Sequence, residues 1–228
     1  YLTCEENFNG YFGSTDAAYA LPANYDRYGI GLESRYAYEK FDARFDVSQN
    51  PNEPHRFGYI VEIDPSDPTS TPIKHTALGR FKHENAAAVI APDGRVVVYM
   101  GDDERGEFMY KYVSNGVYTP GGPTSALLDD GQLFVAVFED DMSGKWVALT
   151  PEATGMSAAE IAIFTRVAAS RVGATTMDRP EWVAVNPVAV EGYCCLTNNS
   201  RRGVRPNAGG DWTPAKGPNP RNENRYGQ

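Results

Sequence analysis

Short runs of β-forming residues, separated by Gly, Pro and Asp, recur along this chain and constrain its fold more than any other feature. The run "DGRVVVYMGDD" at 93–103 begins with an Asp-Gly turn, and "EFMYKYVS" at 107–114 follows it as a candidate hairpin partner. The other candidate strands are 56–64, 75–81, 86–92, 131–140, 144–150, 181–187 and 193–199. Such runs are typical of sandwiches, barrels and propellers. We predict an all-β fold, and the spacing also fits propeller blades of about 40–50 residues.

One segment departs from this pattern. Residues 157–173, "SAAEIAIFTRVAASRVG", carry apolar side chains such as Ile161 and Phe164 at helical spacing. The segment begins with Ser157, a residue type that caps helix N-termini, and closes with a glycine. We therefore predict a helix near 157–171, inserted between strands.

Composition and charge bound the class of protein. The chain has 228 residues, enough for one large domain or two small ones, and 41% of them are hydrophobic, which is ample material for a core. We treat 1–228 as a single domain. Its formal net charge of -9 disfavours nucleic acid as a partner and suits a protein that holds cations, although many soluble proteins are equally acidic. No stretch approaches the roughly 18 apolar residues of a membrane helix, so we expect no membrane partner.

The cysteines raise the first question of chemistry. Cys4, Cys194 and Cys195 make an odd number with one adjacent pair, which is a poor disulfide framework. Cys4 stands before Glu5 and Glu6. Either Cys4 is a buried small hydrophobe beside solvated carboxylates, or the motif is a metal site with soft and hard ligands. Strand alternation puts Cys4 and Glu6 on one face and Glu5 on the other, but a strand end need not follow it, so which glutamate points inward stays open.

Three further clusters of polar residues stand at the ends of candidate strands. They are Lys82-His83-Glu84-Asn85, Asp102-Asp103-Glu104, and Asp178-Arg179 with Glu181. Each has an ordinary structural interpretation: a capping or core histidine, a solvated acidic turn, or a surface ion pair worth little. Taken singly, none is specific. Four such clusters, counting the one at Cys4, in one acidic, strand-rich chain favour a multinuclear metal centre.

Longer motifs carry a family resemblance. The stretches "TCEENFNGYFG", "PNEPHRFGYIVEIDPSDPTSTPIKHTALGRFKHENAA", "VVYMGDDERGEFMYKYVS", "GATTMDRPEWVAVNP" and "CLTNNSRR…NPRNENRYG" resemble the PhoX alkaline phosphatases in the same order, from Tyr1 to Gln228. The resemblance implies a six-bladed propeller, exported by the twin-arginine route, of which this chain is a central piece. It also implies that some metal ligands lie upstream of Tyr1.

The resemblance implies roles for individual residues. Cys4 matches a cysteine ligand to iron, Glu84 and Glu181 match carboxylates of the metal centre, and Asp103 is similar to a calcium ligand. Arg179 matches the arginine that contacts phosphate, and with Glu181 it is the expected catalytic pair. The implied metal ligands are therefore Cys4, Glu6, Glu84, Asp103 and Glu181.

The implied function is hydrolysis of small phosphate monoesters with Fe³⁺ and Ca²⁺, by a periplasmic or secreted monomer. Clustered cations neutralise the charge of a phosphoryl group, and a guanidinium binds two of its oxygens in a fork. Two alternatives stay open. A calcium-dependent propeller lactonase or esterase would leave Cys4 and Arg179 without a role. A non-catalytic propeller would use the carboxylates for structural calcium only.

Overall fold

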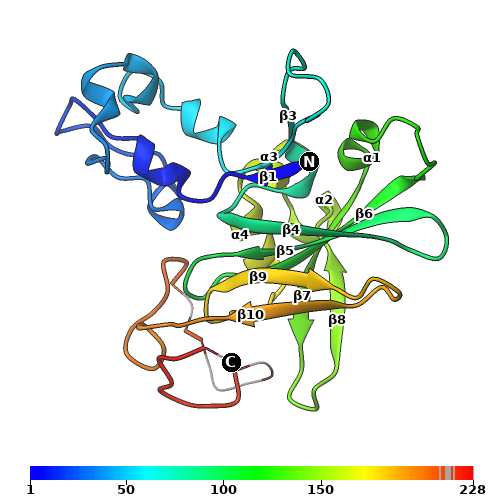
Figure 1. The fold of residues 1–228 in the computed structure, drawn as a ribbon. Coiled ribbons are helices and arrows are strands. Elements are labelled where there is room, and N and C mark those ends of the chain that lie inside the picture. The colour runs from blue at the N-terminus through cyan, green and yellow to red at the C-terminus, as the bar shows by residue number, and fades with distance from the viewer. Residues whose placement is uncertain (211, 214–216, 218, 228) are drawn as a thin grey trace.

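Antiparallel sheets dominate the fold, with a few short helices beside them (Figure 1). The computed structural model describes residues 1–210, 212, 213, 217 and 219–227. The strands are β1 (Leu2–Cys4), β2 (Ile60–Glu62), β3 (Ile73–His75), β4 (His83–Ile90), β5 (Arg95–Asp102), β6 (Met109–Val117), β7 (Gly131–Phe138), β8 (Gly144–Ala148), β9 (Pro180–Val185) and β10 (Gly192–Leu196). The α-helices are α1 (Ser125–Asp129), α2 (Pro151–Thr154), α3 (Ala158–Ile163) and α4 (Thr165–Arg171). Six 3₁₀ helices span Phe8–Tyr11, Asp26–Tyr28, Tyr38–Lys40, Ala43–Phe45, Glu53–Arg56 and Thr76–Leu78.

The central sheet is a five-stranded antiparallel meander in the order β4-β5-β6-β7-β8. Alternate residues of β5 enter two different cores. Val98 and Met100 belong to the core that also holds helical residues, whereas Val97 and Tyr99 pack with Val183 of β9. Because both faces of β5 are covered, its sequence is an apolar run rather than an alternating one.

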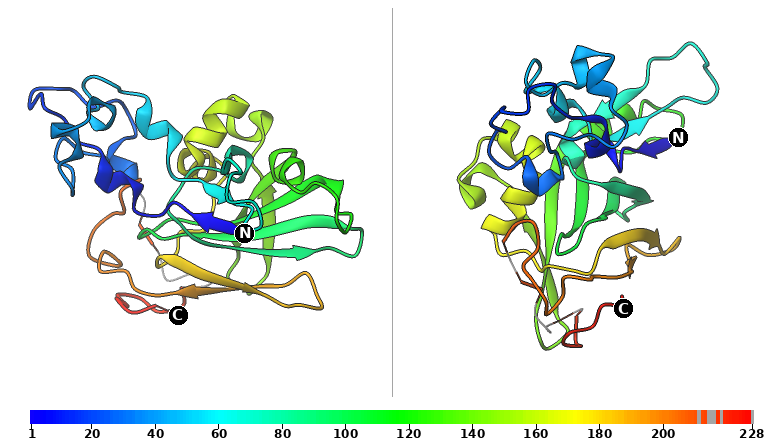
Figure 2. Two further views of the ribbon diagram at one scale, coloured as in Figure 1. Left: turned by 45° about the horizontal axis from the view of Figure 1, so that its top comes forward. Right: turned by 90° about the vertical axis from the view of Figure 1, so that its left-hand side faces the viewer.

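Two smaller sheets complete the layers. The helices cover one face of the meander, and the two-stranded sheet β9-β10 lies across the other (Figure 2). The Asn85 side chain ties β4 to β9, because it donates to the Val183 carbonyl at 2.6 Å and accepts from its nitrogen at 2.8 Å. The three-stranded sheet β1-β2-β3 lies beside β4, on the side opposite β9, and contacts β4 through β1 (Figure 1). The first residues of β4 thus lie between β1 and β9.

The segment between β1 and β2 has its own aromatic core. Phe8, Phe12, Tyr25 and Tyr28 are buried together among its 3₁₀ turns, the blue lobe of Figure 1. This lobe joins the main body through Tyr28, whose hydroxyl accepts from the Arg166 nitrogen at 3.3 Å.

Two of the predicted elements need correction. The strand expected at 75–81 is wrong beyond His75, because the chain turns into the 3₁₀ helix Thr76–Leu78 and reaches Gly79 with a φ of 84°. A side chain at Gly79 would press on Leu133 and Thr165. The position therefore favours glycine and a turn over an extended strand.

The single helix expected at 157–171 is two helices, α3 and α4, separated at Phe164, whose φ of -110° and ψ of 46° are not helical. Phe164 packs its ring edge on His55, 5.3 Å away between centroids. The predicted start is confirmed, because Ser157 forms a capping box with Glu160. Helices α1 and α2 were not predicted.

The other expected strands are present within a few residues of their predicted bounds. The described residues show three antiparallel sheets and no closed barrel or propeller, so the propeller stays a prediction. In the same residues, none of the helices has both the length and the apolar character that a membrane crossing requires.

Candidate metal centre

Three carboxylates from different strands meet at one point. Oxygens of Glu84, Asp103 and Glu181 all lie within 4.8 Å of one another. Two ligand atoms that bind the same calcium ion, each at about 2.4 Å, cannot lie more than about 4.8 Å from each other. The three side chains are therefore spaced as ligands of a shared cation would be.

The sheet geometry explains this convergence. Glu84 lies in an irregular stretch of the β4–β5 ladder, where the register shifts between His83 and Ala86. Such bulges re-aim a side chain at the end of a strand. Asp103 follows β5 directly, and its nitrogen donates to the Lys82 carbonyl at 3.0 Å. Glu181 is the second residue of β9, which crosses these strand ends.

Two predicted ligands of the N-terminal motif, Glu6 and Cys4, lie near the three carboxylates but are not among the side chains whose ligand atoms all lie within 4.8 Å of one another. Burial first, and then the charge of Asp103, raises the pKa of Glu6. Burial and the charges of Glu6 and Glu84 raise the pKa of the Cys4 thiol to about 11. Glu6 is therefore close enough to Asp103, and Cys4 close enough to Glu84, for their charges to interact.

Glu5 points the other way. Its carboxylate accepts from the nitrogens of Gly58 at 3.0 Å and Tyr59 at 3.1 Å, and pairs with Lys74 at 2.7 Å. Glu5 is thus a structural anchor for the turn before β2. The alternation of a β-strand continues past the end of β1, with Cys4 and Glu6 on one face.

A guanidinium stands at the rim of the cluster. Arg179 Nη2 lies 2.8 Å from Asp103 Oδ1 and 2.9 Å from Glu181 Oε1. Its side chain is 22% exposed, so a ligand from solvent can reach it. Thr197 donates to Glu181 Oε1 at 2.5 Å and lies 3.4 Å from Arg179 Nη1.

The backbone of Arg179 is unusual. Its φ of 58° lies in the left-handed region, which costs a non-glycine residue roughly 1–3 kcal/mol. Residues are held in such conformations when the surrounding structure fixes them, and they gather at functional sites.

The electrostatics of the cluster favour a bound cation. Burial raises the pKa of Glu84 to about 7, helped by the charges of Glu181, Asp103 and Glu6. Its Oε2 atom is buried and has no hydrogen-bond partner among the described residues. Like charges crowded this way resist ionisation unless a cation neutralises them. The oxygen donors suit calcium, and the thiol of Cys4 adds a donor that suits a transition metal.

Neighbouring residues of the predicted clusters have other roles. His83 is fully buried, stacks on Phe81 with 3.7 Å between centroids, and has its pKa lowered to about 3 by burial. Asp102 is buried and pairs with Arg166, while Glu104 pairs with Lys82 at 2.9 Å. Of the acidic run Asp102-Asp103-Glu104 at the end of β5, Asp103 is the member that enters the cluster.

Three residues in or near the cluster were not predicted from the sequence: Thr197, Arg166 and Arg202. Thr197 lies in the quoted motif "CLTNN", so its motif was the available signal. The two arginines make buried ion pairs with aspartates far away in the sequence. No local sequence pattern predicts these ion pairs. Cys194 and Cys195 are free thiols.

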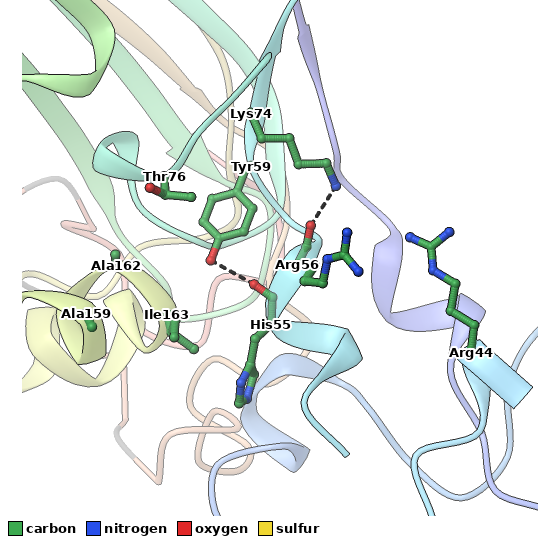
Figure 3. Close-up of a pocket in the computed structure, with 9 residues that line it drawn as sticks. All are labelled: Arg44, His55, Arg56, Tyr59, Lys74, Thr76, Ala159, Ala162 and Ile163. Atoms are coloured by element: carbon green, nitrogen blue, oxygen red, sulfur yellow. Dashed lines mark hydrogen bonds between the residues drawn. The ribbon is translucent and has the colours of Figure 1, made fainter. Parts of the chain in front are cut away.

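A separate hollow of about 540 Å³, whose lining residues Figure 3 shows, shares no residue with this cluster. Its lining residues are Arg44, His55, Arg56, Tyr59, Lys74, Thr76, Ala159, Ala162 and Ile163. Its three cations are already paired: Arg44 and Arg56 with Glu53, and Lys74 with Glu5. It contains none of the clustered carboxylates, so its size does not make it the reactive site.

Comparisons with known proteins identify the family. The family model for alkaline phosphatase PhoX matches residues 1–228. A solved structure, Pseudomonas fluorescens PhoX in complex with vanadate, a transition state analogue, shares 49% identity with a TM-score of 0.91. That match covers 100% of this chain and 41% of the solved chain, so this chain spans less than half of its length. A search of curated proteins found no match. With its whole length matched by the family model, the chain belongs to the PhoX alkaline phosphatase family.

Proposed function

We propose that the protein containing this chain hydrolyses phosphate monoesters at a cation centre formed by Glu84, Asp103 and Glu181, with Cys4 and Glu6 as further ligands. The observation that carries the proposal is the convergence of the three carboxylates beside an accessible guanidinium, Arg179. The related PhoX of known structure was solved with vanadate, a transition state analogue.

The metals we propose are Fe³⁺ and Ca²⁺, which when bound supply positive charge to neutralise a phosphoryl group. Cys4 and the carboxylates would hold them. Arg179 binds the oxyanion: its guanidinium carries donors in a fork that matches two phosphate oxygens. Thr197 helps to orient Glu181, because its hydroxyl donates to the carboxylate. Arg179 and Glu181 are thus the residues we assign to substrate handling and metal binding.

Family membership also supports the wider proposal for the whole protein. We propose that this chain forms part of a six-bladed propeller and that the mature protein is a periplasmic or secreted monomer. Its substrates would be small phosphate monoesters.

The experiment measures iron, calcium and turnover in the full-length protein. We expect both metals, hydrolysis of p-nitrophenyl phosphate, and loss of that activity when calcium is chelated and its return when calcium is restored. A lactone serves as the control substrate. Turnover of the lactone without turnover of the phosphate ester would contradict the proposal, and calcium without iron would contradict the assigned role of Cys4.

A further inference from the structure

Two buried ion pairs lie next to the contact between Asp103 and Arg179, and each involves the residue directly before one of these two. Asp102, directly before Asp103, is fully buried and pairs with the fully buried Arg166. Asp178, directly before Arg179, is also fully buried and pairs with Arg202, which is 2% exposed. In each case a buried arginine is ion-paired with the aspartate that directly precedes a site residue in the sequence.

The first pair connects the helices to the site. Arg166 of α4 places Nε 2.7 Å from Asp102 Oδ2 and Nη2 2.6 Å from Asp102 Oδ1, a two-pronged contact. Its third nitrogen donates to the Arg27 carbonyl at 2.5 Å. Each of the three guanidinium nitrogens thus donates to an acceptor, and two of these bonds hold the carboxylate of Asp102 at the end of β5.

The second pair connects the C-terminal segment to the site. Arg202 Nη1 lies 3.0 Å from Asp178 Oδ2, and Arg202 Nη2 donates to the Asn219 carbonyl at 2.9 Å. The Asp178 carbonyl also accepts from the Thr197 nitrogen at 3.0 Å. Asp178 is therefore ion-paired through its side chain, without a hydrogen bond to its carboxylate among the described residues, and hydrogen-bonded through its backbone, next to the residue that adopts the left-handed conformation.

Backbone bonds join the two supports into one frame. The Gly106 nitrogen donates to the Met177 carbonyl at 2.8 Å, and the Met177 nitrogen donates to the Glu107 carbonyl at 3.0 Å. Arg105 and Asp178 form an antiparallel bridge. The segment after Asp103 and the segment before Arg179 are therefore hydrogen-bonded to each other along their backbones.

We propose that Arg166 and Arg202 are positioning residues that hold Asp103 and Arg179 in the geometry of the site. Arg166 fixes a metal ligand and Arg202 fixes the oxyanion-binding guanidinium. This inference rests on the proposed function for what the two site residues bind, but not for how they are held.

The test uses the full-length protein with Arg166→Lys and Arg202→Lys, and Arg80→Lys as a matched control. Arg80 is also a buried arginine, at 1% exposed, but its guanidinium bonds to the Pro54 and Phe57 carbonyls. Calcium content, vanadate affinity by calorimetry and the melting temperature are measured for each. We expect Arg202→Lys to keep its metals and bind vanadate about tenfold more weakly, since small misplacements at a site carry large costs. Arg166→Lys should lose calcium. Variants that differ from Arg80→Lys only in melting temperature would overturn the inference.

A second set of variants keeps the inference testable if the single substitutions prevent folding. Asp178→Ala with Arg202→Met, and Asp102→Ala with Arg166→Met, remove both charges of a pair and leave no unpaired buried charge. A crystal structure of the first should show Arg179 displaced from Asp103, and one of the second should show Asp103 displaced. Unmoved side chains would overturn the inference. Because this readout needs no turnover, it separates failure of the positioning role from failure of the phosphatase proposal.

Discussion

At the scale of single residues, the site is a group of acids whose mutual repulsion a cation would relieve. Glu84 shows this most directly, since its pKa is raised to about 7 by burial and by its acidic neighbours. Arg179 offsets part of that charge but lies to one side, against Asp103 and Glu181. This arrangement suits the proposed function, which requires a cation in the middle of the cluster and an anion at its rim.

The role of Cys4 is tested by Cys4→Ser in the full-length protein. An oxygen of similar size replaces the soft donor, so the fold should persist while most of the iron is lost. Activity should fall by at least about ten- to a hundredfold, the range for residues that only support a metal ligand. Cys195→Ser, at an exposed free thiol, is the control. Full iron content in Cys4→Ser would return Cys4 to the role of a buried hydrophobe.

Arg179 and Glu181 contact each other, but substitutions at the two positions should have different effects on metal content and on activity. Arg179→Lys should keep the metals and lose roughly a hundredfold in kcat/KM, because an ammonium cannot make the two-pronged contact. Glu181→Gln should release metal, because a neutral amide balances less charge. Metal content and kinetics of both variants decide between these roles. If both changes were nearly silent, the pair would be an ordinary ion pair.

His55 should make the stability of the fold depend on pH. Its pKa is lowered from about 6.5 to about 4, by burial first and then by Arg80. The neutral ring is favoured in the folded state, so its contribution is complete above pH 6.5 and is lost as the pH falls through about 4. Melting temperatures of His55→Gln should therefore fall less steeply between pH 6.5 and 4 than those of the unchanged protein. Parallel curves across that window would contradict this.

At the scale of elements, the site depends on how closely β9 crosses β5. Gly101 makes this crossing possible, because a Cβ there would collide with the Pro180 and Glu181 carbonyl oxygens. Glu181 reaches Glu84 and Asp103 across this contact.

Gly101→Ala should therefore destabilise the fold by about 1–3 kcal/mol, as overpacking does, and also weaken metal binding. Gly31→Ala is the matched control, because the nearest atom to its added Cβ is the Glu33 nitrogen at 3.9 Å. Denaturant unfolding and calcium titration of both variants make the comparison. Equal calcium affinity in Gly101→Ala and the unchanged protein would show that the close crossing does not shape the site.

Local sequence signals predicted most elements but not their interruptions. Val96 to Met100 read as a buried strand because β-forming residues follow one another without a break. The break at Phe164 could not be predicted, because helical spacing continues through it and tertiary contact with His55 accompanies the change of backbone. Likewise, the turn after His75 depends on crowding of Gly79 by distant residues.

The candidate site residues could be proposed from the sequence for a different reason. Long motifs that resemble those of a known family contain Cys4, Glu84, Asp103 and Glu181. The family resemblance of these motifs therefore indicated the residues, without any knowledge of their contacts. Their supports, Arg166 and Arg202, depend on pairs formed across 64 and 24 residues of sequence, and no local pattern indicates which aspartate a distant arginine will meet.

At the scale of the whole molecule, the chain is 41% of the length of its solved relative. The cluster of acids is nevertheless assembled within this chain, from β4, the residue directly after β5, and β9. The described part of the fold therefore already brings these proposed ligands together.

The most direct test of the metal centre is a crystal structure of the full-length protein with anomalous scattering data measured on both sides of the iron absorption edge. We predict metal peaks within about 2.0–2.6 Å of carboxylate oxygens of Glu84, Asp103 and Glu181, with the iron peak next to Cys4. An active enzyme whose metal peaks lie elsewhere, with these side chains bound to no ion, would contradict the account.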